Sequence, residues 1–247
     1  MNEQTAAKRW WAQAILVGGV IAAVCLPLGA LGTKVGLWAF TGGFMLLAAG
    51  AVLATLASFL GVIAYIISLR KNLVAERPTV LIGIFLGIVV LGILGMQYSA
   101  ASSVPPIHNI STDTVNPPQF DKIVALRTAK ANPLTYNSAE LAPQQTKAYP
   151  WVKPLTLQAS ADEVVDRAEA VLRDMGLEIV SVNKNAGLVE ATATTFWFGF
   201  KDDVAVRVQP AADGGTQVDV RSISRVGQSD LGANAARIGE ILNGLGG

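Results

Sequence analysis

Three long apolar runs fill the first hundred residues, and they constrain the fold more than any other feature of this sequence. They cover about residues 10–31, 38–69 and 78–98, and none of them contains a charged residue. Each reaches the roughly 20 residues that a helix needs to cross a hydrocarbon core about 30 Å thick. We therefore predict a membrane anchor over residues 1–98 with three transmembrane helices, the second of them longer than one crossing requires.

The basic residues around these runs predict the orientation of the anchor. Only Lys34 lies between the first and second runs, whereas five others precede the first run or separate the second from the third: Lys8, Arg9, Arg70, Lys71 and Arg77. Because basic loops remain in the cytoplasm, the N-terminus is expected there and everything after Tyr98 on the other side of the membrane. The first run exceeds the apolar core of a signal peptide, so we expect it to be retained.

Charged side chains inside spans mark ion and proton pathways, and these three runs have none. The membrane part is therefore interpreted as an anchor or a helix-packing platform. Gly83 and Gly87 have the small-xxx-small spacing that lets helices approach closely. Packing within the three-helix unit and contact with another molecule both fit this spacing.

Composition excludes several function classes for residues 99–247. These residues hold 13 basic and 16 acidic side chains, which leaves no basic footprint for nucleic acid. The one cysteine, Cys25, lies in the first apolar run, so the exported part can form no internal disulfide. His108 is the one histidine, and a histidine-based triad or metal site lacks its partners. We predict no metal, no cofactor and no nucleic-acid partner.

Residues 99–154 are polar and rich in proline, so they are expected to form extended, irregular chain. Apolar residues such as Ile110, Phe120 and Trp151 recur along them, whereas a disordered stalk is usually less apolar. We predict that this proline-rich extended segment packs on the domain that follows.

Residues 155–247 carry the pattern of an α+β domain. After a short strand, Ser160 and Glu163 have capping-box spacing and open an amphipathic helix that Gly176 ends. Four more strands follow: one at about 177–182, one at about 188–198, and two on either side of a turn at 210–215. A last helix is expected at about 230–245. The order β-α-β-β-β-β-α predicts an antiparallel sheet with its helices on one face, in a helix-grip-like arrangement.

The two strands around the turn separate valines from charges. Val204, Val206, Val208, Val218 and Val220 share one face, and the other carries Asp203, Arg207, Asp219, Arg221 and Arg225. Opposite charges on paired strands predict a solvated salt-bridge ladder. The alternative is an anion-binding site of Arg207, Arg221, Arg225 and Ser229, because the chain then enters what looks like a helix N-terminus. Asp230 in that first turn competes for the positive end of the helix.

The densest aromatic cluster of the sequence comprises Phe196, Trp197, Phe198 and Phe200. Core packing at the end of a strand is one interpretation. The other makes these residues the lining of an apolar ligand site or a contact with the membrane, since aromatic side chains favour the interface.

A hydrolase-like enzyme is the alternative from another function class. It would use Asp202, Asp203 or Asp230 with Ser222 or Ser224. The sequence contains no GxSxG elbow, HExxH helix, GxGxxG fingerprint or Walker loop. We therefore assign no catalytic residue.

Five segments of the sequence carry a resemblance to a known family. They are PPIHNISTD at 105–113, NPPQF at 116–120, YPWV at 149–152, GFKDDVAVRV at 199–208 and VDVRSISRVGQSDLGANAARI at 218–238. From about residue 104 to the C-terminus the chain resembles DUF1499, a domain of unknown function. The resemblance implies that the proline-rich segment belongs to the module and that the protein resides in a bacterial envelope. It implies no reaction, cofactor or catalytic residue.

These inferences predict a protein of the bacterial inner (cytoplasmic) membrane with a periplasmic C-terminal domain. We expect a non-catalytic binding or assembly module. Membrane lipids and an envelope protein are its expected partners.

Overall fold

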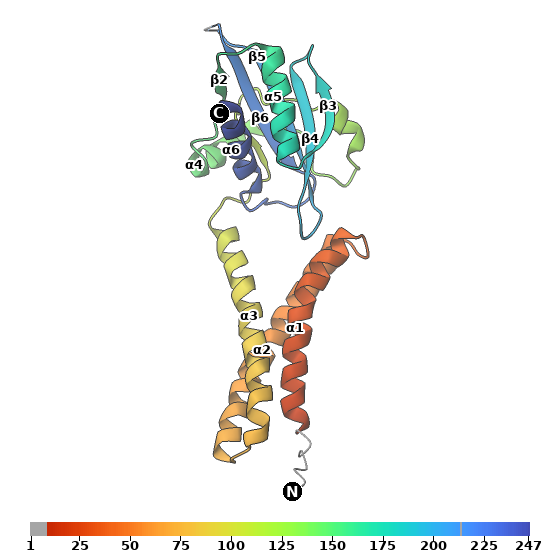
Figure 1. Cartoon of the computed structure of the whole chain (residues 1–247), viewed down its shortest axis with the longest axis vertical. Helices are drawn as coiled ribbons and strands as arrows, with labels where there is room; N and C mark the ends of the chain where they lie inside the picture. The colour runs from red at the N-terminus through yellow and green to blue at the C-terminus, as the bar shows by residue number, and fades with distance from the viewer. Residues whose placement is uncertain (1–8, 213) are drawn as a thin grey trace. The chain divides into compact units, whose positions relative to one another are not determined.

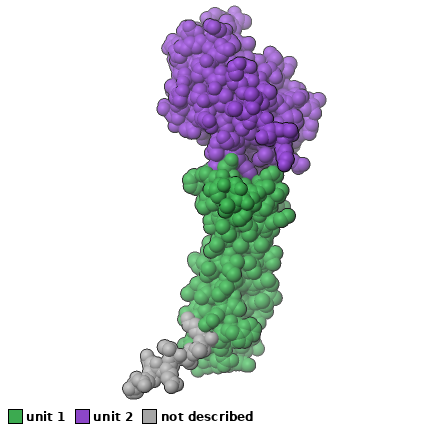
Figure 2. All heavy atoms as spheres, turned by 90° about the vertical axis from the view of Figure 1, so that its right-hand side faces the viewer, with its two compact units in different colours: residues 1–100, 196–199 green, residues 101–195, 200–247 purple. Residues whose placement is uncertain are grey.

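The structure is a computed structural model that describes residues 9–212 and 214–247, so Lys8 and Asp213 lie outside it. The chain forms two compact units, shown in Figure 2. The first comprises residues 1–100 and 196–199, and the second comprises residues 101–195 and 200–247. Each unit is described separately below.

The first unit contains the three helices that the apolar runs predict. They are α1 (Trp10–Lys34), α2 (Phe40–Arg70) and α3 (Arg77–Ser102), with a short 3-10 helix, η1 (Val74–Glu76), before the third. All three are long and apolar enough to cross a membrane. Each helix contains most or all of the predicted run and continues one to four residues beyond its C-terminal end.

Small residues bring these helices together at close range. A Cβ atom on Gly83 would lie 2.8 Å from the carbonyl oxygen of Ile15, and one on Gly87 would lie 2.7 Å from that of Ala54. Both distances are too short for any side chain, so α3 meets α1 and α2 through these two glycines. A Cβ on Gly92 or Gly95 would meet nothing within 4 Å. The small-xxx-small pair therefore packs within the unit.

The second unit is an antiparallel sheet with helices, which confirms the α+β prediction. Its strands are β1 (Asn109–Ser111), β2 (Leu155–Leu157), β3 (Glu178–Asn183), β4 (Leu188–Thr194), β5 (Lys201–Pro210) and β6 (Thr216–Ser224). The sheet order is β1-β6-β5-β4-β3, and β2 also pairs with β6. From β2 onwards the element order is the predicted one.

The helices α5 (Ala161–Asp174) and α6 (Ala233–Gly246) lie across one face of the sheet (Figure 1). Valines supply that face, because Val206 pairs with Val220 and Val208 with Val218, in the register that the sequence predicts. Ser160 caps α5 by accepting a hydrogen bond from the Glu163 amide. Burial of this valine layer beneath the two helices forms the core of the domain.

Two further elements interrupt the segment that was expected to be extended. They are a 3-10 helix, η2 (Lys122–Leu126), and an α-helix, α4 (Ser138–Ala148), with Pro143 inside it. Tertiary contacts hold α4 despite its proline. Its Leu141 packs against the core, and the Gln145 amide hydrogen-bonds the backbone N–H and C=O of Ser111.

The second sheet face was predicted to carry a solvated ladder, and that prediction is wrong. Asp203 and Asp219 are fully buried, and Arg221 is 1% exposed. The cause is the segment before β2, which lies against this face and is held to it by the hydrogen bonds described below. Arg207 does pair with Asp219 across the strands, as expected of opposite charges.

Candidate functional site

Arg221 is the largest fully buried side chain of the described residues. It projects from β6 on the sheet face opposite α5 and α6. Its guanidinium donates hydrogen bonds to Asn109 Oδ1 at 3.1 Å, to the Pro118 carbonyl at 3.1 Å and to the Leu134 carbonyl. These acceptors come from three points of the segment before β2, so a single side chain ties that segment to the sheet.

Two aromatic rings complete the surroundings of this cation. The guanidinium carbon of Arg221 lies 5.2 Å from the ring centroid of Phe120 and 5.8 Å from that of Tyr136. Burial lowers the pKa of Arg221 to about 10, and burial raises the pKa of the Tyr136 hydroxyl to about 12. The arginine is thus still a cation at neutral pH, stabilised by carbonyl oxygens and ring faces in place of water.

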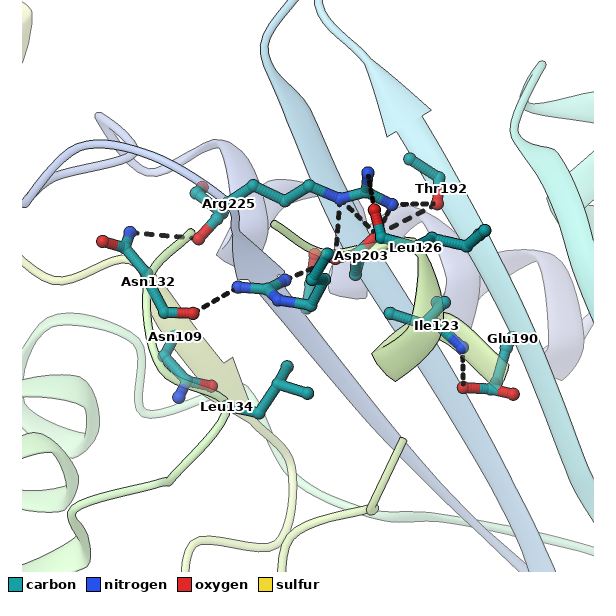
Figure 3. Close-up of polar contacts among 12 residues, drawn as sticks. Asn109, Ile123, Leu126, Asn132, Leu134, Glu190, Thr192, Asp203 and Arg225 are labelled. Atoms are coloured by element: carbon teal, nitrogen blue, oxygen red, sulfur yellow. Dashed lines mark hydrogen bonds and ion pairs between the residues drawn. The ribbon is translucent and has the colours of Figure 1, made fainter. Parts of the chain in front are cut away.

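Arg225 is held by Asp203, as Figure 3 shows. Its Nη2 donates to Asp203 Oδ1 at 2.7 Å, and its Nε lies 3.0 and 3.1 Å from the two carboxylate oxygens. Arg127, from the segment before β2, donates to the same carboxylate. Two cations therefore share one buried anion, and Thr192 donates to it as well.

Arg207 bridges two carboxylates. Its Nη2 lies 3.0 Å from Asp113 Oδ2 and 3.0 Å from Asp219 Oδ2. Burial raises the pKa of Asp113, but hydrogen bonds from the Asn116 and Val115 amides and the charge of Arg207 outweigh it. The net effect holds that pKa below its ordinary value.

Ser229 and Asp230 stabilise the turn that leads into α6. Ser229 Oγ accepts a hydrogen bond from the Leu231 amide, while the Asp230 carboxylate accepts from Gly232 at 2.8 Å and from Asn234 at 2.9 Å. Burial raises the pKa of Asp230 against these hydrogen bonds, and the charge of Asp202 adds to the rise. Asp230 thus occupies the positive end of this helix, as the sequence suggested for it.

The four residues of the predicted anion site therefore take part in four separate sets of contacts. Arg207, Arg221 and Arg225 each have partners within the domain, and Ser229 serves a turn. Each of the three arginines nevertheless has an acceptor in residues 109–134: Asp113 for Arg207, the Leu126 carbonyl for Arg225, and Asn109, Pro118 and Leu134 for Arg221. Their common effect is to hold the segment before β2 against the sheet.

Glu190 is a further member of this network, and the sequence reasoning missed it. Glu190 is fully buried on β4, and its carboxylate accepts hydrogen bonds from the amides of Asp121 and Lys122 at 2.8 Å. It also accepts one from the Ile123 amide at 3.3 Å, as Figure 3 shows. It therefore satisfies the first amides of η2. A signal for it exists, because a carboxylate in the middle of a strand with pairing strands on both sides requires buried donors.

The serines of the hydrolase alternative lie in a different network on the helix-covered face. The Ser222 hydroxyl donates to Asn234 Oδ1 at 2.6 Å and accepts from Arg237 at 3.0 Å. Arg237 also pairs with Asp202, and the Asn234 amide donates to Ser224. Neither the Asn234 amide nor the Arg237 guanidinium is a base that could remove the proton of the Ser222 hydroxyl. These contacts therefore do not activate Ser222 as a nucleophile.

His108 contacts the protein backbone, and the described residues contain no metal-binding cluster. The Nδ1 atom of His108 lies 3.2 Å from the backbone oxygen of Gln228. Within residues 9–212 and 214–247, no group of three histidine, cysteine, aspartate or glutamate side chains is placed to hold a metal ion.

The loop between β4 and β5 carries the aromatic cluster. Phe196 and Trp197 are 70% and 55% exposed, and their rings meet edge to face at 5.3 Å. Phe198 and Phe200 are half-buried. The first two rings therefore lie outside the core, and exposed apolar rings of this size are typical of contact surfaces.

A groove of about 360 Å³ lies elsewhere in the domain, between the end of α5, β4 and α6. Its lining mixes small, apolar and charged side chains and includes none of the aromatic cluster: Met175, Gly176, Leu177, Ala193, Thr194, Ala233, Ala236, Arg237 and Glu240. A ligand pocket floored by Phe196, Trp197 and Phe198 would have favoured a small-molecule module, and the groove does not have that floor.

Comparison with protein families gives one match. Residues 109–245 match the family described as "Protein of unknown function (DUF1499)", and this range contains every described strand, the helix α5 and all but the last residue of α6. A comparison with curated proteins finds no match.

Proposed function

Because this chain belongs to the DUF1499 family of proteins of unknown function, whose description assigns no activity, we propose its role from the geometry of the domain. It is a non-catalytic binding or assembly module of the bacterial envelope. The helices α1 to α3 anchor it in the inner membrane, with the N-terminus in the cytoplasm and the domain in the periplasm. The observation that carries the proposal is the exposure of Phe196 and Trp197 on the β4–β5 loop.

Residues 196–199 of this loop belong to the first unit, and the strands that flank them in the second unit support a membrane contact. Strand β1, by which the chain enters the domain, pairs with the last residues of β6, and the Ser224 amide donates to the His108 carbonyl. The first residue of β5, Lys201, accepts from the Arg225 amide. The β4–β5 loop and the entry of the chain therefore lie at the same end of the sheet.

A short tether keeps that end near the membrane. Helix α3 ends at Ser102 and β1 begins at Asn109. Seven residue steps span at most roughly 25 Å of extended chain. The indole ring of tryptophan favours the headgroup region, because it is apolar but carries an N–H that can donate a hydrogen bond, and an exposed phenyl ring adds apolar surface beside it. We therefore propose that Phe196 and Trp197 contact the lipid interface, which makes membrane lipids the direct partner of the domain.

Site-directed spin labelling tests this contact in the full chain. The one native cysteine, Cys25, is replaced by alanine, and a nitroxide is attached to Trp197→Cys in lipid bilayers. The matched control is Val115→Cys, another exposed apolar position, which follows the far end of β1. Power saturation then measures the accessibility of each label to oxygen, which concentrates in lipid, and to a water-soluble nickel chelate.

We expect the label at 197 to be accessible to oxygen and protected from nickel, and the label at 115 to show the reverse. Equal nickel accessibility at both positions would rule out the lipid contact. Protection of residue 197 from both reagents would also reject it and would favour an envelope protein as the partner of this loop.

A further inference from the structure

An apolar groove of about 440 Å³ runs between α1 and α2 in the first unit. On α2 its lining follows one helical stripe from Leu53 to Ile67, and on α1 it extends from Trp10 to Gly18. The stripe is open, because Leu60 and Ile67 are 49% and 41% exposed. The hydrocarbon of a membrane is the medium in which such a surface is stable.

The length of the groove suits one lipid chain. From Leu53 to Ile67 the helix advances roughly 21 Å at 1.5 Å per residue. This exceeds the half-thickness of about 15 Å that one leaflet contributes to the hydrocarbon core. The groove is therefore long enough to hold the full length of an acyl chain from one leaflet.

One end of the groove is basic. Arg70 and Lys71 follow Ile67 by three and four residues, so they continue the same stripe of α2, and both are exposed. Arg9 directly precedes Trp10 at the corresponding end of α1. Among the described residues the acidic one at this end is Glu76, whose carboxylate lies 3.8 Å from Arg9 Nε. The three cations outnumber it, so the mouth of the groove is complementary to an anion.

We propose that this groove binds an anionic phospholipid from the leaflet on the side of the N-terminus. One acyl chain lies between α1 and α2, and the headgroup phosphate is held by Arg70 and Lys71. The exposed Trp10 ring lies where the headgroup region meets the hydrocarbon. This site goes beyond the proposed role of the β4–β5 loop, and neither depends on the other.

The headgroup preference is tested by native mass spectrometry of the full chain. The protein in detergent is offered equal amounts of phosphatidylglycerol and phosphatidylcholine with identical acyl chains. We expect retention of phosphatidylglycerol, and a loss of about fivefold in the preference for each charge removed in Arg70→Gln/Lys71→Gln. The control Lys147→Gln/Lys153→Gln removes two exposed charges from the other unit and is expected to keep the preference.

The acyl-chain contact is tested separately. A Cβ on Gly18 would meet only Ala57, at 3.9 Å, so Gly18→Leu fits on the helix and fills the groove. We expect this variant to lose both bound lipids. The control Gly92→Leu introduces the same side chain on α3, where a Cβ meets nothing within 4 Å, and is expected to bind as the wild type does.

Equal retention of the two lipids by the wild type would overturn the proposal. So would undiminished lipid binding by Gly18→Leu relative to Gly92→Leu, or an unchanged preference in Arg70→Gln/Lys71→Gln. The last variant alters exposed side chains, so it remains informative if the substitution at Gly18 perturbs folding.

Discussion

Arg221 is a buried cation whose hydrogen bonds all serve the fold. Arg221→Gln would leave the acceptors on Asn109, Pro118 and Leu134 without their donor, which should cost at least about 3 kcal/mol of domain stability. The matched control Arg173→Gln removes an exposed pair with Glu169 on α5 and should cost well under about 1 kcal/mol. Hydrogen exchange of the β5 and β6 amides in the full chain measures the loss of stability in each of the two variants. Equal protection in the two variants would contradict this structural role.

At the scale of elements, α3 depends on two glycines for its place beside α1 and α2. Gly87→Leu would drive a side chain into the Ala54 carbonyl, 2.7 Å from the Cβ position, so the helices must separate. We expect the melting temperature of the protein in detergent to fall by several degrees. Gly92→Leu on the same helix should leave it unchanged. Helix propensity alone would raise the melting temperature in both variants, because leucine is the better helix former, so an equal fall in both would contradict a specific role for close packing at Gly87.

At the scale of the whole molecule, the distribution of lysine and arginine predicts that the C-terminal domain is periplasmic. Val115 is 89% exposed in that domain, so Val115→Cys in a Cys25→Ala background provides a target for an impermeant maleimide. We expect labelling in intact bacterial spheroplasts. The matched control is Lys71→Cys, exposed on the opposite side of the predicted anchor, which should react only after lysis. The reverse pattern would invert the topology.

Local sequence patterns were sufficient to predict most of the helices and strands of this protein. The three helices that are long and apolar enough to cross a membrane follow from uncharged apolar runs of about 20 residues or more. The order of elements from β2 to α6 follows from alternation and helical spacing, and that order predicts an antiparallel sheet. The register of β5 on β6 follows because a slip by one residue would expose a row of valines such as Val206 and Val220. The sequence also predicts the cap of α5 by Ser160, because capping depends on residues that are three apart in the chain.

Only the tertiary structure decided whether the charged face of the sheet is buried or exposed to solvent. The pattern placed Asp203, Arg207, Asp219 and Arg221 correctly on one face, but a sequence does not show what covers a face. Contacts over about a hundred residues, such as Arg221 with Pro118 or Arg207 with Asp113, bury that face and turn an expected solvated ladder into an internal network. The exposure of Phe196 was undecided for the same reason, because burial depends on neighbours that are distant in the chain.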